Sequence, residues 1–402
     1  MAWIYAVTLL RALRWPNDWA EAHWLITYEF GPLKRALAGT LIRPLFGREN
    51  PTQDAEWVIL QVSSIALILF SAVLLWMGIR ICYRSRWSIH AAVVVIAFLT
   101  SPYVVMSGHL IGYFDNLLIL FTFLACSLVL RGNPGAAGIV IAVGTLVHET
   151  ILLVGYPTVL FAALVKLSYE LQTSDTRRPS SKTLLRHLPL VVFPMAVFAF
   201  FFVYHSFYRN GWDLCLELKE YLSHYPFIEN DRHIKVAESY GSSFLFYLFD
   251  QSPEFASRFF AYNILVRNVL TAGLLLALAR LALRTSNSPK YFTWLACSIT
   301  ALPLSLHLIA WDTERIWTFP VIVAFLAVWT LYELSPPKDR GTTNLSAFIT
   351  SAVMVVLFHI LITCHLMDDE LEHFTNATRV LWYLPGLAAV AIATLFRQRG
   401  SY

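Results

Sequence analysis

The chain has 402 residues, of which 57% are hydrophobic, 15% aromatic and only 14% charged. A soluble domain carries about 25% charged residues, and so few polar groups cannot cover a water-soluble body of this size. Disorder is excluded by the same composition. The net charge of +4 gives no indication of a nucleic-acid partner. We therefore predict one all-α, polytopic membrane domain over residues 1–402.

Apolar runs of the length that a spanning helix needs, about 20 residues, recur along the chain. They lie at 57–79, 89–107, 114–130, 186–204, 264–283, 291–310, 318–334, 345–366 and 380–396. The stretch 136–165 is interrupted by His148, Glu149 and Pro157. It is predicted to form a hairpin of two short helices, with a single tilted helix as the alternative. About 10–12 transmembrane helices are expected in all.

The basic residues predict the orientation of these helices. Loops near 80–88, 131–134, 166–187, 280–290 and 335–344 and the C-terminus are rich in Lys and Arg and poor in acids. By the positive-inside rule these segments are cytoplasmic. The first 13 residues are apolar but too short to span, and they are either the end of a first helix or an interfacial segment. No basic region precedes them, so they do not resemble a signal peptide.

The opposite face is predicted to carry the longer loops. It holds an amphipathic segment at 15–56, turns at 108–115 and 311–317, the apex of the hairpin, and a loop at 205–262 that is expected to form two or three short helices. Residues 57–204 and 264–396 supply the membrane helices. The acidic stretch 367–373 is most simply a solvated loop.

Within 15–56, the spacing from Leu33 predicts an interfacial helix, because apolar residues recur on one face. Lys34 and Arg35 either face lipid phosphates or bind the phosphate of a lipid-linked substrate. Asp18 and Glu21 precede them and are candidate catalytic carboxylates.

Three further places combine ionisable residues with apolar surroundings. Asp115 begins a hydrophobic helix, so it is either a functional acid or a helix N-cap. His148 and Glu149 form either an acid–base pair or an apex held by hydrogen bonds, and a zinc site is not indicated because a second His is missing. The third place holds Asp312 and Arg315, and Arg267 is added to it. The two arginines are candidate phosphate ligands, because guanidinium groups bind phosphate bidentately. For Asp312 and Arg315 a local salt bridge is the alternative.

The order of these features resembles the GT-C superfamily of integral-membrane glycosyltransferases. A short first helix, a large amphipathic first loop with acids at 18–21, and Asp115 in the second external turn carry the resemblance, which covers roughly the first 205 residues. The segment YEFGPLKRALAG also looks like part of uncharacterised bacterial multi-pass membrane proteins.

The resemblance implies inverting transfer from a polyprenyl-phosphate sugar to an envelope glycan or lipid acceptor. Asp18, or else Glu21 or Asp115, would deprotonate the acceptor, while Lys34, Arg35, Arg267 or Arg315 would stabilise the departing phosphate. No cofactor is expected, and a divalent metal is compatible with this reaction but not indicated by the sequence. Membrane lipids and the lipid-linked donor are the expected partners, and the inner membrane of a bacterium is the expected location.

Two other functions fit the same residues. A transporter or flippase would use the intramembrane polar groups to line a path, although the repeats typical of transporters are missing from the sequence. A polysaccharide polymerase would share the lipid-linked substrate but not the fold.

Overall fold

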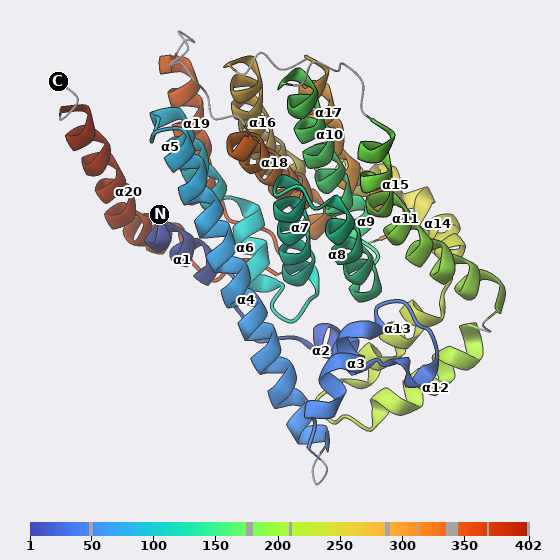
Figure 1. Cartoon of the computed structure of the whole chain (residues 1–402). Helices are drawn as coiled ribbons and strands as arrows, with labels where there is room; N and C mark the ends of the chain where they lie inside the picture. Colours follow the sequence, from blue (N-terminus) through green and yellow to red (C-terminus); the bar gives the residue numbers. More distant parts are fainter. Residues whose placement is uncertain are drawn as a thin grey trace.

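The computed structural model describes residues 1–47, 51–173, 180–208, 211–285, 290–310, 312–334, 345–367 and 370–399. Within these ranges the chain is helical, apart from turns and one isolated bridge between His365 and Leu371. Figure 1 shows long helices side by side, with short helices gathered at one end. The predicted all-α class is confirmed.

Seven helices in the described residues are long and apolar enough to cross a membrane. They involve α4 (Pro51–Arg84), α5 with α6 (Ile89–Leu99, Pro102–His109), α9 with α10 (Ile151–Val154, Tyr156–Thr173), α11 (Ser181–Val203), α16 (Tyr262–Thr285), α17 (Tyr291–Ala301) with its following turn, and α18 (Thr313–Leu334). Shorter apolar helices include α7 (Asp115–Leu130), α8 (Pro134–Val147) and α19 (Leu345–Leu361). The chain is thus a multi-pass helical membrane protein, whereas the total of 10–12 crossings stays a prediction.

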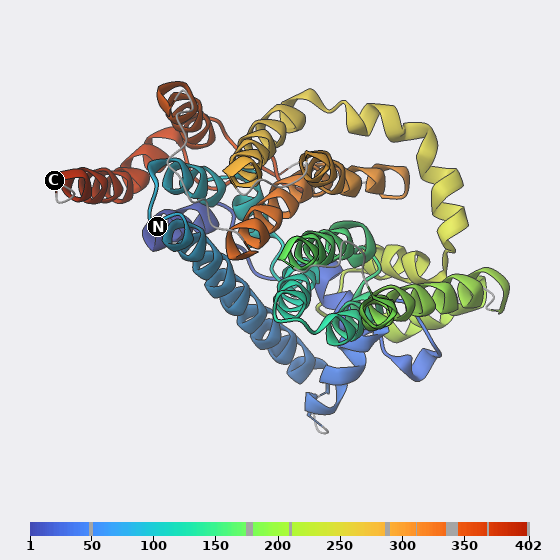
Figure 2. The ribbon, with the colours of Figure 1, turned by 45° about the horizontal axis from the view of Figure 1, so that its top comes forward.

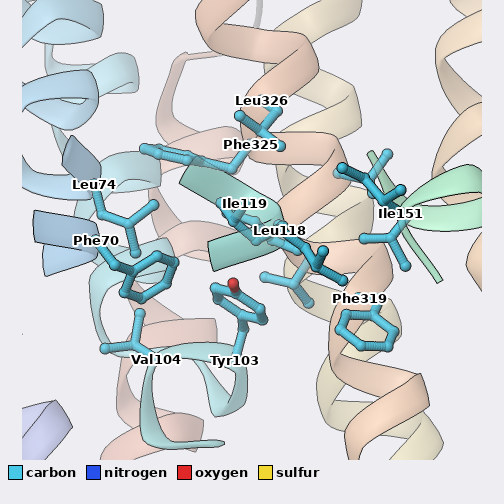
Figure 3. Packing of buried hydrophobic residues seen from close by; sticks show 14 of the residues in the cluster. Phe70, Leu74, Tyr103, Val104, Leu118, Ile119, Ile151, Phe319, Phe325 and Leu326 are labelled. Carbon is cyan, nitrogen blue, oxygen red and sulfur yellow. The ribbon is translucent and has the colours of Figure 1, made fainter. Parts of the chain in front are cut away.

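Helix α18 forms the centre of the core. In the most apolar stretch of α18, 94% of the residues are buried, whereas in the most apolar stretch of α11 only 17% are buried. Phe325 stacks on Phe98 with ring centroids 3.6 Å apart, and Figure 3 shows Phe319 and Phe325 among side chains of α4, α6 and α7. Because outer helices such as α11 expose many Leu, Val and Phe side chains, their surfaces suit hydrocarbon rather than water.

The predicted cytoplasmic ends lie together at one end of the bundle. Arg80 at the end of α4 donates two hydrogen bonds of 2.7 Å to Glu333 at the end of α18. Lys166 of α10 donates to the carbonyls of Val129 and Leu130 at the end of α7. Helix α8 begins just after α7 ends, so the end of α10 lies near the start of α8. Helices α8 and α10 therefore form the predicted hairpin, with its apex around residues 148–150. We call this end of the bundle the basic end.

The other end, here called the loop-rich end, holds α2 (Asp18–Leu25), α3 (Ala36–Ile42), α12 (Gly211–Ser223) and α13 (Asn230–Gly241). The loop after α11 also contains α14 (Phe244–Gln251) and α15 (Phe255–Phe259), so it forms more short helices than expected. Helices α1 (Ala2–Leu10) and α20 (Asn376–Arg399) lie together at the edge opposite α11 and α14 (Figures 1 and 2).

The N-terminal segment is held against the bundle by close backbone contacts. Trp24 donates its indole N–H to the carbonyl of Gly112 at 2.6 Å. A Cβ at Gly39 of α3 would lie 2.1 Å from the carbonyl oxygen of Ile26, so only glycine permits this approach. These contacts place the turn before α3 directly over the hairpin apex.

Candidate functional site

Charged side chains from four separate segments meet at the loop-rich end. Arg35 comes from the turn before α3, Asp115 from the first turn of α7, Glu149 from the hairpin apex and Arg315 from the first turn of α18. His23 of α2 lies within electrostatic reach of both arginines and of Glu149. We use the name polar cluster for the group His23, Lys34, Arg35, Asp115, His148, Glu149, Asp312 and Arg315.

Arg35 and Glu149 form a bidentate ion pair. The Nε of Arg35 donates to both carboxylate oxygens of Glu149 at 3.0 and 2.9 Å, and a second guanidinium nitrogen donates as well. Burial by itself would raise the pKa of Glu149, but the charge of Arg35 and the hydrogen bonds from its guanidinium bring that pKa well below its ordinary value. Arg35 also adopts a left-handed backbone with φ of 63°, which costs a non-glycine residue on the order of 1 kcal/mol. The ion pair with Glu149 therefore holds Arg35 in an unfavourable backbone conformation.

Arg315 joins two aspartates. Its Nε donates to Asp115 at 3.0 Å and its terminal nitrogen to Asp312 at 2.9 Å. Phe114 occupies the N-cap position of α7, so Asp115 lies within the first helical turn and pairs with Arg315 instead of capping. Asp115 is only 4% exposed, and its Oδ2 has no hydrogen-bond partner among the described residues. A buried carboxylate oxygen without a partner is costly and points to a missing proton donor.

His148 is held as a neutral imidazole. Its Nδ1 lies 3.2 Å from the backbone nitrogen of Thr150 and accepts that N–H, so the ring proton belongs on Nε2. Burial, and then the charge of Arg35, lower the pKa of His148 well below its ordinary value despite the nearby Glu149. The hairpin apex therefore offers the N–H of a neutral His148 as a hydrogen-bond donor, and its charge comes from Glu149 alone.

Lys34 and His23 complete the polar cluster. Lys34 donates to the carbonyl of Ser242 at 2.9 Å, and burial followed by repulsion from Arg35 lowers its pKa to about 7. His23 lies 3.0 Å from the hydroxyl of Tyr240, and burial with the neighbouring cations lowers its pKa to about 3. Sequence reasoning missed His23, because the short helix α2 is buried on most sides and has no periodic pattern.

Three of the predicted site residues lie elsewhere. The carboxylate of Asp18 accepts the backbone N–H of Glu229 at 2.8 Å, where α13 begins. Glu21 lies beside Glu56 of α4. Arg267 of α16 donates to the carbonyl of Thr363. Lys34 and Arg35 do not lie on the predicted interfacial helix either, since α3 begins only at Ala36.

Glu21 should make stability depend on pH. Burial, and then Glu56 and Asp18, raise its pKa to about 8 from an ordinary 4.5. Between pH 4.5 and pH 8 the folded state therefore retains a proton that the unfolded state loses. The stability that this proton provides falls as the pH rises from 4.5 and is lost above pH 8. We expect Glu21→Gln to match the wild type in thermal stability near pH 5 and to exceed it near pH 9. Melting curves in detergent measure this effect. If the melting temperatures of Glu21→Gln and the wild type differ by the same amount at both pH values, the raised pKa assigned to Glu21 is wrong.

The polar cluster is not arranged as a metal centre. The described residues contain no group of three or more His, Cys, Asp or Glu side chains placed to hold an ion. No family model, curated protein or solved structure matches the chain. The geometry of the cluster and the multi-pass helical architecture therefore supply the basis for a functional proposal.

Proposed function

We propose that the chain is a glycosyltransferase-like membrane enzyme that uses a polyprenyl-phosphate-linked sugar at the loop-rich end. The observation that carries the proposal is Asp115, whose Oδ2 is buried and unpartnered among the described residues, beside Arg315. A carboxylate in this state can accept a proton from an acceptor hydroxyl. The neighbouring guanidinium groups of Arg35 and Arg315 can stabilise an anionic leaving group.

The proposed reaction is a single displacement at the anomeric carbon. The acceptor oxygen attacks that carbon, and its proton passes to Asp115 Oδ2. The bond from the anomeric carbon to the phosphate oxygen breaks, and its electron pair leaves with polyprenyl phosphate. Attack on the face opposite the leaving group inverts the configuration, so one bond forms and one breaks without a further reactant.

Lys34 is proposed to bind the leaving phosphate together with Arg315. Its pKa of about 7 means that a nearby phosphate would favour the charged ammonium, so binding the donor would be accompanied by proton uptake. Asp312, His148 and Glu149 are proposed to orient the two arginines and the substrate. Of the acids that precede Arg35, Asp18 holds the start of α13 and is the weaker candidate for the base.

A lipid-linked donor also fits the outer surface near the polar cluster. Leu41 of α3 and Leu45 just after it are 67% and 61% exposed, and Trp15 is 73% exposed. Exposed Leu and Trp side chains at the end of a helical bundle are typical of the membrane interface. A polyprenyl chain in the bilayer would therefore lie beside the segment that supplies Lys34 and Arg35.

The test is turnover of a defined donor by purified protein in nanodiscs. Radiolabelled polyprenyl-phosphate hexose and pentose are supplied with a bacterial envelope extract as the acceptor, and released polyprenyl phosphate and transferred label are measured. We expect Asp115→Asn to lower the rate by roughly 10²–10⁴-fold, the usual contribution of a general base. Asp231→Asn, an isosteric change at an exposed residue of α13, should leave the rate unchanged.

Two outcomes would overturn the proposal. One is full transfer by Asp115→Asn, and the other is no consumption of either donor by the wild type. Movement of the intact lipid or of a solute across the bilayer without bond cleavage would instead favour the transporter alternative.

A further inference from the structure

Two basic side chains lie close together at the basic end, beside the turn between α7 and α8. A Cβ added at Gly132 in this turn would lie 3.3 Å from the ammonium of Lys166 and 3.3 Å from a guanidinium nitrogen of Arg186. Lys166 belongs to α10 and Arg186 to α11, so cations from two helices converge on one backbone position. We use the name basic pair for Lys166 and Arg186.

The positions of both side chains are fixed by helix packing. A Cβ at Gly138 of α8 would lie 2.4 Å from the carbonyl oxygen of Pro189 in α11, so the two backbones touch there. Arg186 precedes Pro189 by three residues, which is about one helical turn. Lys166 is held by its two hydrogen bonds to carbonyls at the end of α7. The basic pair is therefore placed by four packed helices.

The charge of the basic pair is balanced only in part. Glu170 of α10 lies 3.6 Å from Lys166, but its side chain is 54% exposed, and an ion pair at such a position contributes little. Arg186 is exposed, and so is Arg131, which precedes Gly132 in the turn. Like charges at close range repel each other, and a phosphate between them can accept hydrogen bonds from both members of the basic pair.

An exposed apolar surface continues from the basic pair along α8 and α11. Phe193 follows Arg186 by seven residues, on the same face of α11, and is 41% exposed. On α8, Gly135 and Ile139 share a face. A Cβ at Gly135 would meet no neighbouring atom within 4 Å, and Ile139 is 53% exposed. Cations above an exposed apolar surface match a phospholipid, with its phosphate at the interface and its acyl chains in hydrocarbon.

We propose that the basic pair and this apolar surface bind an anionic phospholipid, phosphatidylglycerol, in the leaflet at the basic end. The phosphate lies between Lys166 and Arg186, and the acyl chains lie along Ile139 and Phe193. Phosphatidylethanolamine and phosphatidylcholine each carry a cationic group that the basic pair repels, so the site discriminates against both. The site lies at the opposite end of the bundle from the polar cluster, and it is independent of the proposed sugar transfer.

Native mass spectrometry of the delipidated protein tests this proposal. Equal amounts of phosphatidylglycerol, phosphatidylethanolamine and phosphatidylcholine with identical acyl chains are offered in competition. We expect phosphatidylglycerol to be retained roughly 25-fold over the other two, because each of two cations near an anionic headgroup contributes about fivefold. Arg186→Gln should lower this preference about fivefold. Arg280→Gln, which removes an exposed arginine of α16 at the same end of the bundle, is the matched control and should leave it unchanged.

Equal retention of the three lipids by the wild type would overturn the proposal. An equal loss of preference in Arg186→Gln and Arg280→Gln would do so as well, because it would show a general attraction of anionic lipid to the basic end. Thermal melting shows whether each variant remains folded.

Glycerophosphoglycerol, the headgroup without acyl chains, is the soluble probe in a separate arm. If it displaces the lipid as effectively as phosphatidylglycerol does, and with the same dependence on Arg186, the apolar surface contributes nothing and the assignment to a membrane lipid is wrong. Because the readout is lipid retention, failure here leaves the sugar-transfer proposal untouched.

Discussion

Glu372→Gln is expected to destabilise the protein by roughly 3–5 kcal/mol, the usual effect of removing one partner from a buried ion pair. The carboxylate accepts hydrogen bonds from Arg11 of the N-terminal segment and from Arg379 of α20, and its side chain is fully buried. It also accepts the backbone N–H of Cys364 at 3.1 Å. Glutamine keeps the size of the side chain but leaves two buried guanidinium groups facing each other without a counterion.

The free energy of unfolding in detergent, followed by tryptophan fluorescence, measures this effect. Glu370→Gln is the matched control, because Glu370 lies in the same loop and pairs with Arg14 at 3.1 Å but is 44% exposed at its side chain. A solvent-exposed pair contributes at most about 1 kcal/mol. If the two variants are equally stable, the arrangement at Glu372 does not hold α1 to α20.

The second large effect concerns the ion pair of Arg35 and Glu149. We expect Arg35→Met and Glu149→Leu each to lower stability by about 3–5 kcal/mol, because each leaves one charge buried without its partner. The double variant should recover much of this loss, because two apolar side chains of similar volume leave no buried charge without a counterion. The favourable coupling energy in this double-mutant cycle should then exceed about 2 kcal/mol.

The same cycle separates folding from activity. A folded double variant should still fail to turn over a lipid-linked donor, because it lacks the guanidinium proposed to stabilise the departing phosphate. Strictly additive stability changes would show that the two side chains are not coupled. Donor turnover at the wild-type rate by the folded double variant would remove Arg35 and Glu149 from the proposed reaction.

The membrane-helix pattern was predictable from sequence because it depends on local composition. The length of an apolar run reflects the thickness of the bilayer, and basic residues accumulate at one side of it. The interruption at His148 and Glu149 correctly indicated a hairpin, since a polar pair inside an apolar run ends a helix where backbone groups can be satisfied.

The acidic stretch 367–373 shows where local reasoning fails. It was expected to be a solvated loop, yet Glu372 is fully buried between Arg11 and Arg379, while Glu370 remains partly exposed. Residues 368 and 369 lie outside the described part of the chain. The burial of Glu372 could not be read from the neighbouring sequence, because one of its two partners, Arg11, is 361 residues away.

The sequence determined, by itself, that this is a multi-pass helical protein, because water and hydrocarbon act on each segment independently. Only the tertiary structure decided that Arg315 joins Asp115 across 200 positions and that Asp18 and Arg267 lie apart from them. A buried charge must find a counterion or donor in space, and the partner that satisfies it depends on how helices distant in the chain pack together.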